Sequence, residues 1–114
     1  MPPSRRILVA GLIAGTLFVP QIARADALDG EWCKDARSLT IQGPNILTPG
    51  GTQMTGEYSR HQFRYVIPQG EPQQGDTVEM SQRNDEEMDL RIVPAAVGSA
   101  PGAWERWRRC KVTS

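Results

Sequence analysis

Histidine and cysteine are scarce in this sequence of 114 residues, which contains one histidine and two cysteines. A zinc site needs three or four nitrogen or sulfur ligands, and so few candidates argue against such a site. We therefore expect neither a metal ion nor another cofactor. The length restricts the chain to a single small domain.

An excess of positive charge is also missing, since 13 Lys and Arg residues balance 13 Asp and Glu residues. Three of the cations, Arg5, Arg6 and Arg24, lie in the first 25 residues, which contain no acid, so the rest of the chain is mildly acidic. A nucleic-acid-binding surface needs a basic field to displace counterions. The charge balance therefore argues against a nucleic acid partner.

No apolar run reaches the length of about 20 residues that a membrane-spanning helix needs. The longest run, residues 7–19, follows Arg5-Arg6 and precedes Ala23-Arg24-Ala25. A basic, an apolar and a small-x-small segment in this order are typical of a secretory signal. We predict that residues 1–25 are a cleaved signal peptide. Residues 26–114 then form one domain in the periplasm or outside the cell, with no membrane span. The paired arginines also leave the twin-arginine export route open beside the general one.

The two cysteines, Cys33 and Cys110, both lie in the part of the chain that we predict to be exported. An oxidising compartment favours a disulfide between them. The bond would close a loop of nearly the whole domain, for which chain-entropy estimates give on the order of 4 to 5 kcal/mol. A reactive thiol pair is the weaker interpretation, because redox pairs are usually close in sequence.

Glycine and proline divide the remaining chain into stretches that are too short for helices of typical length. Between them, apolar and polar residues alternate, as in Phe63-Arg64-Tyr65 and in Met88-Asp89-Leu90-Arg91-Ile92. Alternation with a period of two places one set of side chains on a buried sheet face and the other set in water. The sequence therefore predicts an all-β domain.

We expect about eight short antiparallel strands, near residues 30–34, 38–42, 45–48, 52–59, 62–67, 76–82, 87–93 and 104–111. Asn84-Asp85 is expected to form a hairpin turn between the sixth and seventh of these strands. Apolar residues occupy even positions before Arg60 and His61, as at Tyr58, and odd positions after them, as at Phe63. This change requires either a two-residue hairpin turn or a bulge. A disulfide between the first and last strands favours a meander that closes into a small barrel. An open β-sandwich is the alternative, since the chain allows only short strands.

A catalytic interpretation depends on His61, the one histidine. The alternative of a small hydrolase would place His61 with Ser59 or an acid in a cleft. No nucleophile-elbow sequence accompanies these residues. We therefore favour a histidine at a turn or on the surface, and no residue is predicted to be catalytic.

The most unusual stretch is Trp104-Glu105-Arg106-Trp107-Arg108-Arg109. Trp and Arg are over-represented at binding hot spots, and aromatic rings with guanidinium groups can stack on sugars or bind acidic protein surfaces. We favour a structural role, in which one Trp fills the core and the arginines pair with acids of residues 87–93. The binding surface should then be sought first around residues 58–65. The candidate binding residues are accordingly Trp107, Arg109, Arg106, Tyr58, His61 and Tyr65.

Thr55-Gly56-Glu57-Tyr58 partly resembles the Ser-Gly-x-x-Tyr type motif of small periplasmic inhibitors of lysozymes, which are exported β-barrels. Thr stands in place of Ser and one residue is missing, so the similarity covers four residues and assigns no family. Together the features predict a non-catalytic binding protein, inhibitor-like or adaptor-like, whose partner is another protein or an envelope polymer. A structural envelope component is the alternative, and the sequence leaves the oligomeric state open.

Overall fold

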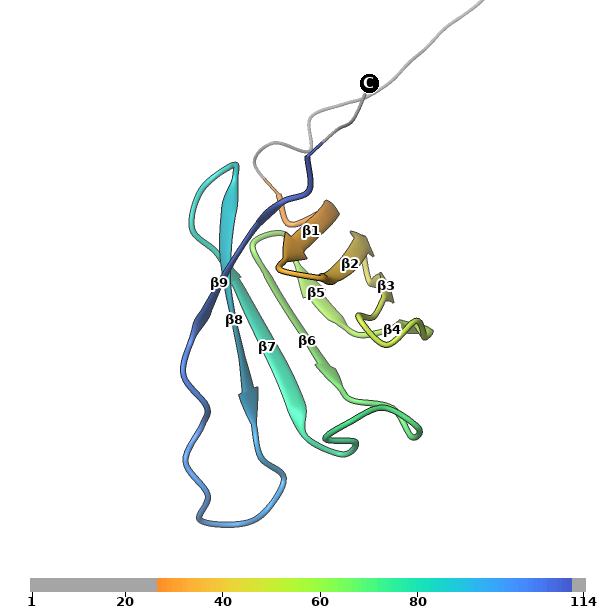
Figure 1. Ribbon diagram of the computed structural model, residues 1–114, viewed down its shortest axis with the longest axis vertical. Helices are drawn as coiled ribbons and strands as arrows, with labels where there is room; N and C mark the ends of the chain where they lie inside the picture. The colour runs from red at the N-terminus through yellow and green to blue at the C-terminus, as the bar shows by residue number, and fades with distance from the viewer. Residues whose placement is uncertain (1–26, 112–114) are drawn as a thin grey trace, which may run out of the picture.

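The computed structural model describes residues 27–111, and the predicted signal peptide, residues 1–25, lies outside the described residues. Nine antiparallel strands form one sheet in the order β4-β3-β2-β1-β9-β8-β7-β6-β5 (Figure 1). Their bounds are Gly30–Lys34 (β1), Arg37–Gln42 (β2), Asn45–Leu47 (β3), Gln53–Thr55 (β4), Glu57–Ser59 (β5), Gln62–Val66 (β6), Thr77–Gln82 (β7), Glu87–Val93 (β8) and Glu105–Arg109 (β9). The prediction of an antiparallel all-β domain is confirmed.

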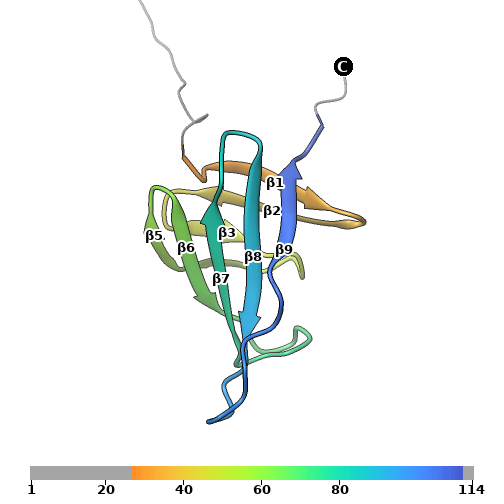
Figure 2. The same cartoon turned by 90° about the vertical axis from the view of Figure 1, so that its left-hand side faces the viewer.

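The sheet curls into a nearly closed barrel, in which β6 to β9 cross in front of β1 and β2 (Figure 2). β4 pairs with β3, and β5 pairs with β6, so these two strands are the first and last of the sheet. Because β4 and β5 are joined through Gly56 alone, the two ends of the sheet meet at this residue. The barrel that we predicted is therefore present, and the sandwich alternative is not.

Gly56 also accounts for one error in the predicted strands, since we expected residues 52–59 to form a single strand. The Gly56 N–H donates to the carbonyl oxygen of Pro44 at 2.8 Å, which continues the β3–β4 register by one residue. A Cβ at this position would lie 2.5 Å from Cε1 of Phe63 and 2.6 Å from the carbonyl oxygen of Arg64. Only glycine allows so close an approach. The chain bends here, and the expected strand becomes β4 and β5.

A tight hairpin at residues 60 and 61 explains why apolar residues shift from even to odd positions there. Ser59 lies opposite Gln62 in the register of β5 and β6, so Arg60 and His61 form a two-residue turn. The carbonyl oxygen of Arg60 accepts a hydrogen bond from the N–H of Leu28 at 2.8 Å. This bond brings the segment that precedes β1 over the end of the barrel.

The barrel interior is occupied by one cluster of buried side chains, to which every strand except β4 and β5 contributes. Trp32 and Trp107 are its largest members, and they are 0% and 1% exposed. The rings of Phe63 and Tyr65 pack edge to face with their centroids 6.4 Å apart. The remaining members are Leu28, Leu39, Ile41, Ile46, Ile67, Val78, Met80, Met88 and Leu90. Inward residues on each strand alternate with outward ones, as the sequence predicts.

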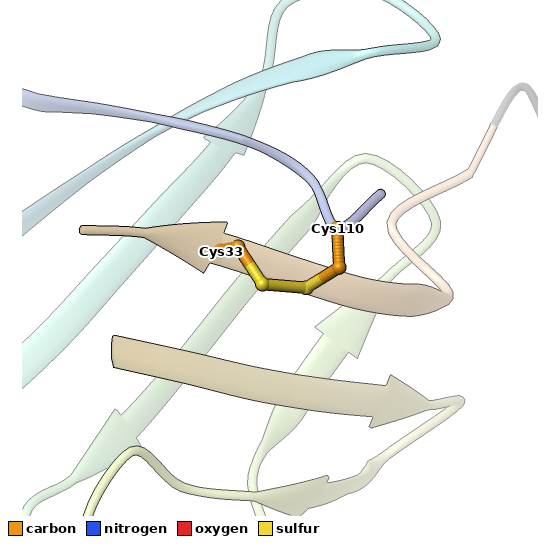
Figure 3. Close-up of a disulfide and its surroundings, with 2 residues drawn as sticks. All are labelled: Cys33 and Cys110. Carbon is orange, nitrogen blue, oxygen red and sulfur yellow. A yellow bond between two sulfur atoms is a disulfide. The ribbon is translucent and has the colours of Figure 1, made fainter. Parts of the chain in front are cut away.

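The junction between β1 and β9 is the shortest ladder in the described sheet, with two residue pairs, Trp32↔Arg109 and Cys33↔Arg108. The predicted disulfide between Cys33 and Cys110 spans this junction (Figure 3). The Cα atoms of the two cysteines lie 4.9 Å apart. The N–H of Cys110 also donates to the carbonyl oxygen of Glu31 at 3.1 Å. The covalent bond therefore reinforces the barrel where backbone pairing contributes least.

Candidate functional site

Two of the three arginines of β9, Arg106 and Arg108, are paired with acids of β8, as we predicted. In the register Arg106 lies opposite Asp89 and Arg108 lies opposite Glu87. Nε of Arg106 is 2.7 Å from Oδ1 of Asp89, and Nη2 of Arg108 is 2.7 Å from Oε2 of Glu87. These cross-strand pairs neutralise much of the cationic stretch.

The same contacts shift the pKa values of the acids. Partial burial by itself raises the pKa of Asp89, but hydrogen bonds from Arg106 and Arg83 outweigh this effect, and the pKa is lowered. A hydrogen bond from the Asn84 side chain is the main cause that lowers the pKa of Glu87, with the neighbouring arginines adding to it. Asp89 in turn raises the pKa of Arg106. Both acids are thus held in the charged form that the arginines of β9 need as partners.

Trp107 and Arg109, two of the predicted binding residues, serve the fold. Trp107 points into the core, and the guanidinium of Arg37 lies 5.1 Å from the centroid of its ring. The guanidinium of Arg109 donates to the carbonyl oxygens of residues 27, 29 and 85. It also lies 4.1 Å from the centroid of the Trp32 ring. Arg109 thereby fastens residues 27–29 across the end of the barrel.

Tyr58 and Tyr65 also direct their rings inward. The Tyr58 hydroxyl donates to Oδ1 of Asp29, whose Oδ2 accepts the N–H of Gly43 at 2.8 Å. Tyr65 is buried, and its burial, followed by the nearby Glu71 carboxylate, raises the pKa of its phenol. Phe63, between them, is buried as well, so the outward residues of the segment 58–65 are Ser59, Arg60, His61, Gln62 and Arg64.

His61 is exposed in the turn between β5 and β6. It lines a hollow of about 360 Å³ with residues of the β7–β8 hairpin, among them Asn84 and Asp85. Ser59 lines a different hollow, on the outer wall of the barrel. The hydrolase alternative, in which His61 acts with Ser59 or an acid, is not tested by these positions.

The outer wall formed by β5 to β8 carries a row of alternating charges. Glu57, Arg64, Glu79 and Arg91 are successive partners in the register of these four strands. Nε of Arg64 lies 3.3 Å from Oε1 of Glu57, and Nη1 of Arg64 lies 4.0 Å from Oε2 of Glu79. Nε of Arg91 lies 2.9 Å from Oε1 of Glu79. We call this row, with Trp104 at its end, the charge ladder.

Trp104 extends the charge ladder beyond β8. The guanidinium of Arg91 lies 4.4 Å from the centroid of the Trp104 ring, within the range of a cation–π contact. The residue remains 48% exposed, in contrast to the two buried tryptophans of the core. Arg91, which its ion pair with Glu79 orients, thus holds the indole against the wall.

The loop before β9 determines where Trp104 lies. The N–H of Ala95 donates to Oδ1 of Asp76 at 3.0 Å, and the N–H of Gly102 donates to the carbonyl oxygen of Ile92 at 2.8 Å. Both ends of the loop are therefore attached to the barrel. These bonds return the chain close to β8, which places Trp104 beside Arg91.

A hollow of about 470 Å³ accompanies the charge ladder on the same wall. Its lining includes all five residues of the ladder and the polar side chains of Ser59, Gln62 and Ser81, which occupy the adjacent row of the same strands. Carboxylate, guanidinium, amide and hydroxyl groups therefore line the same hollow as one half-exposed indole. This combination of concave shape, convergent polar groups and an aromatic ring is typical of a ligand-binding surface. We call it the β5–β8 wall.

No family model, curated protein or solved structure matches this chain. Residues 27–111 contain no group of three or more His, Cys, Asp or Glu side chains that could hold a metal ion. In the same part of the chain, no helix has the length and apolar character that crossing a membrane requires.

Proposed function

We propose that this domain is a non-catalytic binding protein of the periplasm or the cell exterior, which holds a macromolecular partner on the β5–β8 wall. The observation that supports this most directly is the half-exposed Trp104, fixed by Arg91 at the edge of a concave polar surface. A large aromatic ring held in place loses little conformational entropy on binding, and such rings are frequent binding hot spots.

The packing of the barrel supports an external binding surface over an internal one. The interior is filled by two tryptophans, two aromatic rings of β6 and the aliphatic cluster around them. Small barrels with so filled an interior have little room left for a ligand. A partner is therefore expected on the outside, and a macromolecule can cover a wall of this kind.

The proposed location is supported by the signal-like residues 1–25 and by the Cys33–Cys110 bond, since disulfides persist in oxidising compartments. An inhibitor or an adaptor of the envelope would use such a domain in the same way, by presenting a rigid surface to its target.

The proposal is tested by affinity capture from envelope extract with the exported mature protein. Trp104→Ala should abolish capture of the partner without lowering the melting temperature. Leu47→Ala, at a partly exposed residue on β3 in another part of the barrel, is the matched control and should capture as the wild type does. Equal capture by Trp104→Ala and wild type would contradict the assignment of the β5–β8 wall. If none of the three proteins captures a partner, the result would instead favour the alternative of a structural envelope component.

A further inference from the structure

We infer that the β5–β8 wall recognises a neutral, hydroxyl-rich polymer, namely a segment of uncharged oligosaccharide. This inference rests on the proposed binding function and names the chemistry of its partner. It follows from the charge of the wall, from the fixed geometry of its polar groups and from the position of Trp104.

The first argument is the charge of the ladder. Its two carboxylates and two guanidinium groups pair with each other across the four strands, so the row carries no net charge. Association with a polyanion or a polycation is favoured by a surface of the opposite sign. A self-neutralised ladder offers no such field, and it therefore suits a partner without charge.

The second argument concerns the hydrogen-bonding groups. A carboxylate accepts about four hydrogen bonds and a guanidinium donates five, and the ion pairs of the ladder use only part of this capacity. The pairs orient these planar groups on adjacent strands, and Glu57 and Arg64 remain largely exposed. Paired donors and acceptors in fixed positions match the neighbouring hydroxyls of a sugar ring. Gln62 and the two serines of the adjacent row add further donors and acceptors of the same kind.

The third argument is the indole of Trp104. A sugar ring has an apolar face of C–H groups, and an exposed tryptophan offers a flat apolar surface of matching size with a polar edge. Because Arg91 already fixes the ring, stacking costs little loss of side-chain freedom. Trp104 and the ladder thus supply the apolar and polar halves of one saccharide site.

A protein partner suits this wall less well. Protein interfaces usually bury an apolar core from which charged residues are depleted. The ladder instead places four charged residues across the wall, whereas Phe63 and Met80 belong to the core cluster and Tyr58 packs against it. A protein would have to cover these ion pairs and leave their unused hydrogen-bonding positions without water, which is unfavourable.

The inference is tested by nuclear magnetic resonance with the mature protein labelled with ¹⁵N. The probes are neutral linear oligomers of N-acetylglucosamine and of glucose, each about four to six units long, since a hollow of this size holds a short segment. A saturable shift of the Trp104 indole N–H is expected with at least one probe. The indole signals of Trp32 and Trp107 are internal controls and should not move, because both rings are buried.

Variants and a charged probe complete the test. Trp104→Ala should weaken binding about tenfold or more, Trp104→Phe should weaken it less, and Leu47→Ala should leave it unchanged. A sulfated polysaccharide should bind no better than the neutral oligomers. Absence of any shift of the Trp104 signal, or stronger binding of the charged probe, would overturn the inference.

Failure of the inference is distinguishable from failure of the proposed function. If the oligomers do not bind but capture from envelope extract still depends on Trp104, the partner is of another chemistry and the binding function stands. If neither experiment depends on Trp104, both proposals are wrong.

Discussion

Removal of the Cys33–Cys110 disulfide should greatly lower the free energy of unfolding. The bond joins residues separated by 77 positions. In the chain-entropy model, a crosslink closing a loop of this length restricts the unfolded chain by about 15 cal/mol/K, or about 4.5 kcal/mol at 25 °C. A domain of this size has roughly 5 to 15 kcal/mol of total stability. The expected loss is therefore a large fraction of the total, and the short β1–β9 ladder has little pairing with which to compensate.

The assay is urea unfolding of the wild type and of the double variant Cys33→Ala/Cys110→Ala, followed by the fluorescence of the buried tryptophans. Replacing both cysteines avoids an unpaired thiol. The midpoint should fall, and the dependence on urea should become steeper because the chain without a crosslink exposes more surface when it unfolds. A difference below about 1 kcal/mol would refute the reasoning, since it would mean that the bond barely restricts the unfolded chain.

Three further substitutions test the fold. Gly56→Ala should cost about 1 to 3 kcal/mol in urea unfolding, because the added Cβ meets Phe63 at 2.5 Å; an unchanged midpoint would show that the bend does not depend on glycine. Arg109→Lys should cost about 1 to 3 kcal/mol, because an ammonium group cannot bond all the carbonyl oxygens that the guanidinium reaches; an unchanged melting temperature would contradict this. The folded-state pKa of Asp89 lies below its ordinary value of 3.8, so its stabilising effect is complete above that pH and is lost as the pH falls further. The Asp89→Asn variant should therefore lose less stability than the wild type between about pH 4 and pH 2, which a pH series of melting curves measures. Equal losses would contradict a stabilising ion pair between Arg106 and Asp89.

Most of the fold was predictable because strict alternation identifies both the strands and their inward faces. β1 and β8 have the expected bounds, and the acid–arginine pairing of β8 with β9 follows from opposite charges on strands joined by one loop. The break at Gly56 was not predictable. It depends on the close approach of the Phe63 ring and the Arg64 carbonyl oxygen to Gly56, which the β5–β6 hairpin creates once it is formed.

The candidate site was less accessible from the sequence. We expected one Trp of the stretch 104–109 to fill the core, and Trp107, itself a candidate binding residue, occupies that place. Trp104 was not among the candidates, because its position beside Arg91 depends on how the loop 94–104 returns to β8. The charge ladder was missed for a related reason. Alternation shows that Arg64 and Glu79 point outward, whereas their alignment in one row depends on the register of separate hairpins. The signal that could have found the ladder is the opposite charge of outward residues on strands expected to be neighbours.

Photocrosslinking from position 104 is the most direct test of the β5–β8 wall as the binding surface. A benzophenone amino acid, whose phenyl rings keep an aromatic group at the position as Trp104→Phe does, replaces Trp104 in one protein and Leu47 in another. Both proteins are irradiated in envelope extract. Benzophenone reacts with C–H bonds of proteins and of sugars alike, so either class of partner can be captured. The wall assignment predicts a defined adduct from position 104 and none from position 47. Adducts from position 47 alone, or equal adducts from both positions, would contradict it.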